Sequence, residues 1–392
     1  MTLDRRIGVL AAAFGGSLVV AACGGSSDTS GGGSTPTPTA AQSSACQGTT
    51  AAPGYNNGIS TVSGQATSLS GAGGTFVAPM MSIWTGTYAT QASVQIAYAS
   101  VGSGAGIAQL QAGSVDFGES DAFMTDSDIA KAKGPVVQVP LAQAPVTIAY
   151  NLPSVTGGLH FDGETIGKIF AGLITTWNDP AIKALNPSVT LPSLPIAVVH
   201  RSDASGTTNI FSDYLTKESP SWVSTIGAGK SVGKTIAWPV GIGGKGNDGV
   251  SAAVGQNSGG IGYVELAYAR SQNLTYANVK NKAGNFVEPC VKTAAQATAG
   301  ITTYPPDLRI DVVDASTNAD AYPITGLTWA LVYQNQTDQS KAAALLNFFS
   351  WVLTKGQDQA ATADYTPLGS DLQKLCIGQL HKITLNGSPV SP

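Results

Sequence analysis

The sequence has 392 residues, which is enough for two domains or two large lobes, because one domain commonly takes about 100–200 residues. Hydrophobic residues make up 43% of the chain, charged residues make up only 11%, and the formal net charge is -4. A nucleic-acid-binding protein needs a clustered basic face, which a net charge of -4 does not suggest. The chain has three histidines and four scattered cysteines, which are few ligands for a zinc site. These values argue against a polynucleotide-binding protein, a coiled coil and a polytopic membrane protein.

Residues 1–22 have the pattern of a signal peptide. Arg5 and Arg6 precede the apolar stretch Ile7–Ala22, which is shorter than the ~20 residues that span a bilayer. The stretch ends in VAACG at 20–24, which resembles a bacterial lipobox, so we expect Cys23 to be acylated and to become the mature N-terminus. An ordinary cleavage site before a cysteine is the alternative. Export by the general secretory route and export by the twin-arginine route both stay open.

Residues 23–55 are rich in Gly, Ser, Thr and Pro with almost no charge, and we expect a lipid-anchored flexible tether. Cys46, Cys290 and Cys376 allow one disulfide outside the cytoplasm, and spacing cannot choose the pair. Cys46 with Cys376, which would join the two ends of the chain, is the favoured pairing. Free buried cysteines are the alternative.

From about residue 70 the pattern alternates between strands and helices. The strands are expected at 94–99, 136–139, 146–150 and 196–199, and the helices at 78–88, 105–112, 208–215 and 342–353. This alternation predicts an α/β protein with mainly parallel sheets.

Three turns that each lead into a predicted helix carry the chemistry. Their sequences are GAGGTF at 71–76, GSG at 102–104 and RSDASGT at 201–207. Each places a hydroxyl and glycine-freed N–H groups at a helix start, which suits a small anion. Arg201 adds a guanidinium fork matched to a tetrahedral oxyanion. Plain helix capping by Ser or Thr is the alternative for any one of the three.

An exported hydrolase or phosphatase that uses Ser120 or Ser205 is the competing function. GESDA at 118–122 approaches a nucleophile elbow, with alanine in place of the last glycine. Such chemistry needs an activating base or metal ligands. The best-placed histidine, His200, follows a predicted strand and is expected to pack near its end. We therefore expect no enzyme, no metal and no cofactor.

The order of longer motifs resembles the substrate-binding lipoproteins of bacterial Pst-type phosphate ABC transporters (the PstS family). The resemblance covers roughly residues 68–370. It is carried by GAGGTFVAP at 71–79, VGSGAGIAQL at 101–110, VDFGESDA at 115–122, TTWNDPAIKALNP at 175–187, IAVVHRSDASGTTNIF at 196–211, WPVGIGGKGNDGV at 238–250, GGIGYVELAYA at 259–269 and AYPITGLTWALV at 321–332.

The resemblance implies a type II periplasmic-binding-protein fold, with two α/β lobes joined by two crossover strands and a ligand cleft between them. Lobe I would comprise residues 56–148 plus 325–392, and lobe II residues 149–324. The implied protein is a monomer on the periplasmic or outer face of the cell envelope, attached to the membrane by its lipid. It captures inorganic phosphate and delivers it to an ABC permease for import. A binding protein for another tetrahedral oxyanion, such as sulfate, stays a further alternative.

Carried over motif by motif, the implied phosphate ligands are Thr75, Phe76 (through its N–H), Ser103, Asp121, Arg201, Ser205, Gly206 and Thr207, with Asp203 orienting Arg201. The sequence departs from the family at Gly104 and Ala105, where a second serine or glycine is common, and at Ala204, where glycine is common. The first departure puts only an additional hydroxyl contact in doubt. We expect Asp121 to select phosphate, because an ionised carboxylate accepts a hydrogen bond from P–OH and sulfate brings no proton.

Overall fold

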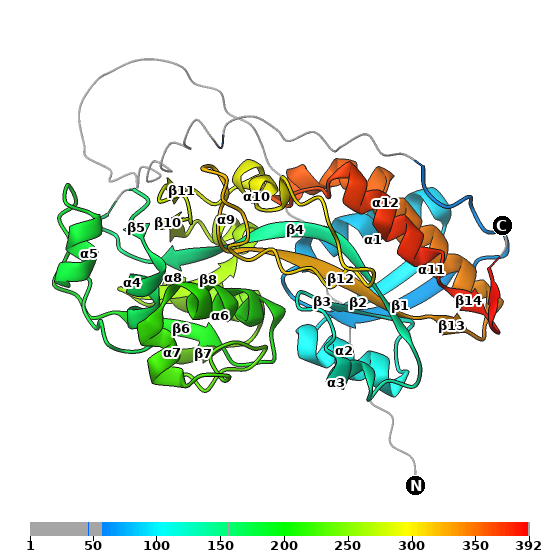
Figure 1. Cartoon of the computed structure of the whole chain (residues 1–392), viewed down its shortest axis with the longest axis horizontal. Coiled ribbons are helices and arrows are strands. Elements are labelled where there is room, and N and C mark those ends of the chain that lie inside the picture. The colour runs from blue at the N-terminus through cyan, green and yellow to red at the C-terminus, as the bar shows by residue number, and fades with distance from the viewer. Residues whose placement is uncertain (1–45, 47–56, 156, 391–392) are drawn as a thin grey trace, which may run out of the picture. The chain divides into compact units, whose positions relative to one another are not determined.

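A computed structural model describes residue 46, residues 57–155 and residues 157–390 (Figure 1). The predicted signal peptide, Cys23 and all of the predicted tether except Cys46 lie outside the described residues. Up to the centre of the chain the elements are β1 (Ser68–Gly73), α1 (Ala78–Ala92), β2 (Gln95–Ser100), α2 (Ser103–Ala112), β3 (Phe117–Ser120), α3 (Asp126–Ile129), β4 (Val136–Tyr150), β5 (His160–Phe161), α4 (Gly163–Phe170), α5 (Pro180–Leu185), β6 (Ala197–Arg201), α6 (Gly206–Glu218) and α7 (Pro220–Ile226). The remaining elements are β7 (Ile242–Gly244), α8 (Gly246–Gln256), β8 (Gly260–Glu265), α9 (Leu266–Ser271), β9 (Thr275–Tyr276), β10 (Asn278–Lys280), β11 (Phe286–Val287), α10 (Val291–Thr298), β12 (Thr325–Tyr333), β13 (Asn335–Gln336), α11 (Gln339–Val352), the 3-10 helix η2 (Lys355–Ala363), α12 (Ser370–Leu380), β14 (Thr384–Leu385) and β15 (Ser388–Pro389).

One large sheet organises the described chain, in the order β2-β1-β3-β12-β4-β8-β6-β7, with β9 also paired to β4. Strand β1 is parallel to β2 and β3, and β6 is parallel to β7 and β8. In the middle, β12 runs antiparallel to both β3 and β4, and β4 runs antiparallel to β8. The expected parallel pairing therefore holds in each half of the sheet, while its centre is antiparallel.

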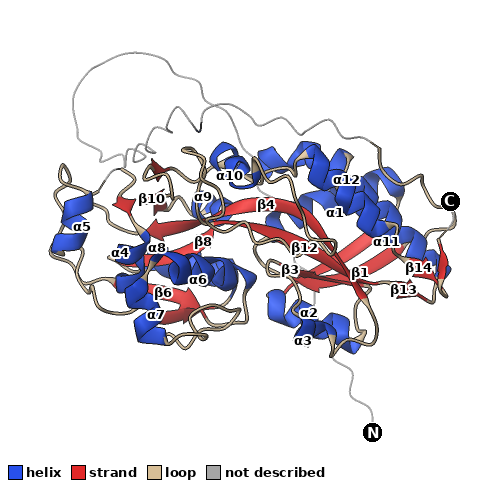
Figure 2. Ribbon diagram, in the orientation of Figure 1, coloured by secondary structure: helices blue, strands red, loops and turns tan. Residues whose placement is uncertain are grey.

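The two halves of the sheet belong to two lobes, which β4 and β12 connect (Figures 1 and 2). Lobe I contains β1–β3 with α1, α2, α3, α11 and α12, and so draws on both ends of the described chain. Lobe II contains β6–β8 with α4, α6, α7 and α8. Because parallel strands end at the same edge of a sheet, each lobe presents its strand-to-helix turns together.

Strand β4 corrects one expectation. The sequence predicts two short strands at 136–139 and 146–150. They form one strand of 15 residues. Over residues 136–145 only β12 pairs along it, apart from a single bridge at Gln143, and the register shifts opposite Pro140. A missing proline N–H costs little where a strand is paired on one side only.

The predicted helices are confirmed, with ends that local chemistry sets. Helix α1 starts at Ala78 with a proline in its first turn and ends at Ser93, which takes the left-handed conformation with φ of 56°. Helices α2 and α6 begin two residues earlier than expected, at Ser103 and Gly206. Among the described residues, no helix is both long enough and apolar enough to cross a membrane.

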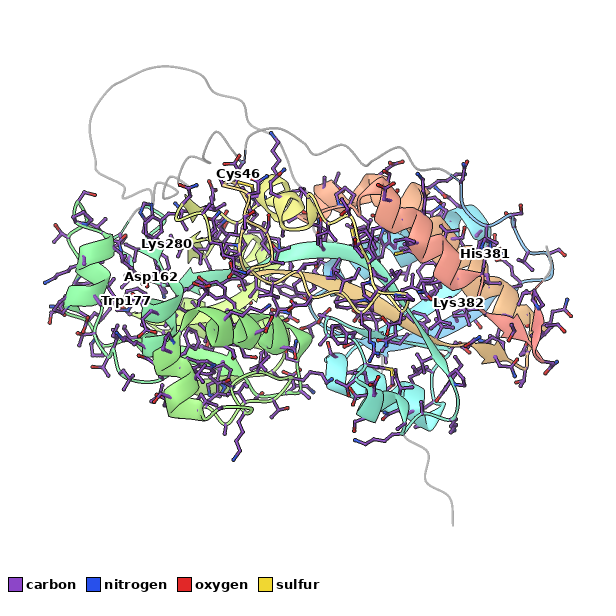
Figure 3. All side chains as sticks on the ribbon, viewed as in Figure 1. Cys46, Asp162, Trp177, Lys280, His381 and Lys382 are labelled. Atoms are coloured by element: carbon purple, nitrogen blue, oxygen red, sulfur yellow. A yellow bond between two sulfur atoms is a disulfide. The ribbon has the colours of Figure 1, made fainter. Side chains whose placement is uncertain are left out.

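The expected Cys46–Cys376 disulfide is wrong. Cys46 pairs with Cys290, with their Cα atoms 5.9 Å apart, whereas Cys376 is a free, buried thiol in α12. Cys290 immediately precedes α10, and Figure 3 places Cys46 beside that helix. The sequence does not show which cysteines lie close together in space, and a disulfide needs Cα atoms about 4.4–6.8 Å apart.

Candidate functional site

Four of the predicted ligands lie at the strand ends of lobe I. Thr75 and Phe76 follow β1 and precede α1, Ser103 is the first residue of α2, and Asp121 directly follows β3. All four side chains are buried. Gly102, just before Ser103, has φ of 94°, and a Cβ there would lie 2.4 Å from Asp203 Oδ2 of lobe II. Glycine at this position therefore allows both the turn and the approach of the other lobe.

The other predicted ligands lie at the end of β6 and the start of α6 in lobe II. Arg201 ends β6, Ser205 caps α6 by accepting a hydrogen bond from the N–H of Thr208 at 3.1 Å, and Gly206 and Thr207 form the first turn. The hydroxyl of buried Tyr263 accepts a hydrogen bond from the Arg201 N–H at 3.1 Å, and its ring stacks on Phe211 with centroids 4.3 Å apart. The aromatic core thus fixes the main chain that carries the arginine.

Asp203 holds the Arg201 guanidinium, as the sequence predicted. Arg201 Nε donates to Asp203 Oδ1 at 2.8 Å, and the neighbouring Nη2 pairs with Oδ2. Burial raises the pKa of Asp203, but the hydrogen bonds and charge of Arg201 outweigh it and hold that pKa below its ordinary value. Arg201 Nη1 also donates to Thr207 Oγ1 at 3.3 Å. The guanidinium is therefore charged, buried and fixed in direction.

Hydrogen bonds join the two sets of residues into one cluster. Ser103 Oγ accepts from the N–H groups of Gly206 and Asp121, each at 3.1 Å, and donates to Asp121 Oδ2 at 3.0 Å. A Cβ on Gly206 would lie 2.5 Å from the Cβ of Asp121, so only glycine allows this approach. The sequence missed Asn247, at the start of α8, whose Nδ2 donates to Thr75 Oγ1 at 2.9 Å and to Thr207 Oγ1 at 3.2 Å.

Asp121 is surrounded by donors. Besides Ser103, Thr328 Oγ1 donates to Asp121 Oδ1 at 3.0 Å. Burial raises the pKa of Asp121 to about 6, while hydrogen bonds from Glu119, Ser103 and Thr328 and the charge of Arg201 oppose the rise. At neutral pH Asp121 is therefore ionised and able only to accept hydrogen bonds.

Thr328 and Glu119 are the other residues that sequence reasoning missed. Thr328 lies inside β12, where alternation marks it only as one face of a strand, and Glu119 lies in β3. Both are fully buried. A fully buried carboxyl in a strand points to a functional role, but the residue type alone does not show that Glu119 is buried.

Ser120 and His200, two residues of the alternative enzyme site, each contact other groups. Ser120 Oγ donates to the carbonyl of Ala122, and His200 stacks on Trp238 with centroids 5.1 Å apart while its Nδ1 lies 3.0 Å from the Arg201 carbonyl. His200 thus packs near the end of β6, as expected. Within residues 57–155 and 157–390 and at Cys46, no group of three or more His, Cys, Asp or Glu side chains is arranged to hold a metal ion.

A pocket of about 250 Å³ lies in lobe II and does not coincide with the predicted anion site. Its lining includes Arg201 and Asp203 but not Thr75, Ser103 or Asp121. The remaining lining residues are His200, Ser202, Thr208, Lys234, Thr235, Ile236 and Trp238. The hydrogen-bonded cluster between the lobes, and not this pocket, contains the hydroxyls and the carboxylate expected of the site.

Two α/β lobes whose strand-end turns meet around a buried arginine define a periplasmic-binding type of ligand-binding protein. The model of the PBP superfamily domain matches residues 41–355. The phosphate-binding protein PstS of Xylella fastidiosa is 41% identical over 308 residues, covering 78% of this chain and 83% of that relative. PstS of Methanocaldococcus jannaschii is 35% identical over 336 residues, covering 79% and 85%. The chain therefore belongs to the PstS family.

Solved structures agree with this fold. The phosphate-binding protein from Stenotrophomonas maltophilia has a TM-score of 0.65 at 20% identity, covering 80% of this chain and 94% of that one. A high-affinity periplasmic phosphate-binding protein, PfluDING, solved with bound phosphate, has a TM-score of 0.64 at 21% identity, covering 78% and 92%. The predicted type II periplasmic-binding fold is confirmed.

Proposed function

We propose that the protein captures inorganic phosphate outside the cytoplasm and delivers it to an ABC permease for import. One observation carries the proposal. Predicted ligands from separate parts of the chain lie in one buried cluster, in which Ser103 meets Gly206 and Asn247 joins Thr75 to Thr207. The relatives named above are phosphate-binding proteins, and this cluster has the chemistry that such a ligand needs.

Each residue has a distinct role in this proposal. Arg201, oriented by Asp203, supplies the charged fork, while the hydroxyls of Thr75, Ser205 and Thr207 donate to phosphate oxygens. Ser103 donates to Asp121 Oδ2 at 3.0 Å in the structure and would turn its proton to the phosphate when the ligand binds. The Ser205 hydroxyl uses a lone pair to cap α6, so its proton remains free to donate. The N–H groups of Phe76, Gly206 and Thr207 lie at helix starts, where backbone donors favour an anion. Asp121 accepts a hydrogen bond from P–OH.

Isothermal titration of the purified protein with phosphate, sulfate and arsenate tests the proposal. We expect saturable binding of one phosphate per chain and much weaker binding of sulfate, because sulfate brings no proton to donate to Asp121 and places a like charge against it. A chromogenic phosphate ester, assayed in parallel, tests the hydrolase alternative. Turnover of the ester without stoichiometric phosphate binding would overturn the proposal.

We also propose a lipid-anchored monomer. Cys23 would carry the lipid and residues 23–55 the tether, with lobe I formed by residues 56–148 plus 325–392 and lobe II by residues 149–324. The lipobox-like VAACG at 20–24 and the low-charge stretch after it support the anchor. Cys23→Ser should release the protein into the soluble fraction or leave its signal peptide uncleaved. A correctly processed Cys23→Ser protein that still fractionates with membranes would contradict the anchor.

A further inference from the structure

A second carboxyl, that of Glu119, lies beside Asp121 and is fully buried. Its Oε2 accepts hydrogen bonds from the N–H of Gly74 at 2.5 Å and from the hydroxyl of Tyr98 at 2.7 Å. Its Oε1 contacts Thr328 Oγ1, the same hydroxyl that lies 3.0 Å from Asp121 Oδ1. Thr328 thus bridges the two carboxyls.

The number of protons in this bridge shows that one carboxyl is protonated. Thr328 has a single hydroxyl proton, which can be donated to one oxygen only. Its contacts with Glu119 Oε1 and Asp121 Oδ1 are both hydrogen bonds only if one of the acids provides a second proton. Two ionised carboxylates around one hydroxyl would instead leave a buried repulsive pair.

The surroundings of the two carboxyls place that proton on Glu119. Asp121 feels the charge of Arg201 and accepts a hydrogen bond from Ser103, and both favour its ionised form. Both donors to Glu119 reach Oε2, which leaves Oε1 as the protonated oxygen. The sequence of donation through Thr328 is then Glu119 Oε1–H to Thr328 Oγ1, and Thr328 O–H to Asp121 Oδ1. The protonated Glu119 also interacts with Asp121 directly, which favours the same assignment.

We propose that Glu119 is a specificity-determining positioning residue, which stays protonated and, through the Thr328 hydroxyl, holds Asp121 in the ionised, accepting state that selects an anion carrying a proton. This inference rests on the proposed phosphate-binding function. Glu119 does not touch the anion in this scheme. It sets the protonation of the residue that does.

The electrostatics of the pair agree with this assignment. Burial raises the pKa of Glu119 well above its ordinary value, and the charge of Asp121 and a hydrogen bond with Asp121 raise it further, against the hydrogen bonds that Glu119 shares with Thr328 and Tyr98. Besides Asp121, the titratable group that faces Glu119 is Tyr98, whose own pKa burial raises well above its ordinary value. The charge of Arg201 lowers the pKa of Asp121, and Tyr268 helps to raise that of Tyr98.

Binding of a phosphate dianion should raise the pKa of Glu119, since ionised Glu119 would add a third negative group beside Asp121 and the phosphate. Phosphate affinity should therefore fall at alkaline pH, by up to about tenfold per pH unit once Glu119 ionises in the free protein. Glu119→Gln keeps a neutral donor but cannot ionise, so its affinity should lose this alkaline decline.

The experiment measures two quantities on the full-length protein. Infrared spectra at pH 7.5 should show the carbonyl stretch of a protonated carboxyl that is lost in Glu119→Gln. Titration with inorganic phosphate at increasing pH above 7 should show, once Glu119 begins to ionise, a decline in affinity that approaches about tenfold per pH unit for the wild type and stays below about threefold per unit for Glu119→Gln. Glu164→Gln, which removes a carboxyl on α4 of lobe II, should retain both wild-type properties.

Thr328→Val is the second variant, in case Glu119→Gln does not fold. It removes the bridging hydroxyl, so the infrared band should shift and the preference for phosphate over sulfate should fall about tenfold. An unchanged band in both variants, or an alkaline decline that persists in Glu119→Gln, would overturn the inference. Failure of the proposed function would look different, because the wild type itself would not bind phosphate.

Discussion

At the scale of single residues, the most informative group is a carboxylate in a site built for an anion. Asp121 accepts hydrogen bonds from Ser103 and Thr328, and burial raises its pKa to about 6. Above that pH it only accepts, so a ligand that brings a proton is favoured over one that does not. Below that pH it is protonated and can donate to an oxygen of either anion.

Asp121→Asn should therefore narrow the preference for phosphate over sulfate, because the amide can donate to sulfate. Sulfate does not titrate between pH 5 and pH 8, so it gives the cleaner pH series. Sulfate affinity of the wild type should rise as the pH falls through about 6, whereas that of Asp121→Asn should stay flat. Competition titrations measure both, with Asp213→Asn on α6 as the control. An unchanged preference at pH 7 would show that selectivity lies elsewhere.

The turns that carry Thr75, Ser103 and the stretch 201–207 could be predicted from the sequence, because glycine, hydroxyl residues and spacing are informative where a strand leads into a helix. Asp121 was proposed only through the resemblance of its motif to the family. Thr328 could not be predicted, because a threonine inside a strand has no local sign of facing a carboxylate from β3. That contact depends on the order of strands in the sheet.

At the scale of elements, the disulfide ties residue 46 to the start of α10. The two cysteines are separated by 244 positions, so the bond closes a long loop of the unfolded chain. Cys46→Ser should lower the free energy of unfolding by about 2–4 kcal/mol, as expected for loss of a native disulfide. Urea unfolding under non-reducing conditions measures it.

Cys376→Ala provides the control for this change, because it removes a buried cysteine that is not bonded. A reducing agent should lower the stability of the wild type and of Cys376→Ala but not that of Cys46→Ser. Equal sensitivity of all three proteins to the reducing agent would contradict the Cys46–Cys290 pairing.

Elements with strong hydrophobic periodicity could be predicted from the sequence, whereas elements whose bounds depend on strand pairing could not. Helix α11 lies at Gln339–Val352, close to the predicted 342–353, because a run of apolar residues at helical spacing is a local property. The sequence predicts two short strands at 136–139 and 146–150, whereas residues 136–150 form one strand, in which the one-sided pairing with β12 tolerates Pro140 and Pro145. Proline rules depend on which edge of a strand is paired, which only the tertiary structure decides.

At the scale of the whole molecule, charged contacts between the lobes add to those within the site. Lys234 Nζ lies 3.2 Å from Asp128 Oδ2, which joins lobe II to helix α3 of lobe I. The carbonyl of Lys234 also accepts from the N–H of Ser205, next to the proposed ligand site. The ion pair with Asp128 should therefore favour the closed arrangement of the lobes.

Lys234→Gln should weaken phosphate binding about two- to fivefold, chiefly through faster release, since a partly exposed ion pair contributes about 0.2–1 kcal/mol. Stopped-flow release of phosphate measures the rate. Lys168→Gln breaks the Lys168–Glu164 pair within lobe II and should leave release unchanged. Equal release rates for wild type and Lys234→Gln would show that this ion pair does not hold the lobes together.

The dependence of folding stability on pH is also a property of the whole chain, and buried carboxyls should shape it. Glu265 ends β8 and is fully buried, where it accepts hydrogen bonds from the N–H of Ala267 at 3.0 Å and the hydroxyl of Tyr365 at 3.1 Å. Burial raises its pKa well above the ordinary value of 4.5. The folded protein thus binds this proton more tightly than the unfolded chain does.

The sign of the effect follows from linkage. The stabilisation from a protonated Glu265 is complete below pH 4.5 and is lost as the pH rises toward the pKa in the folded state, at about 1.4 kcal/mol per pH unit. Glu265→Gln cannot ionise, so its stability relative to the wild type should increase steadily from pH 5 to pH 8 in urea-unfolding series.

Glu164 is the control of opposite sign, because its hydrogen bonds with Ser221 and Ser219 outweigh burial and lower its pKa. Glu164→Gln should therefore lose stability relative to the wild type near neutral pH and approach it as the pH falls. Parallel curves for wild type and Glu265→Gln would mean that Glu265 is ionised in the folded protein.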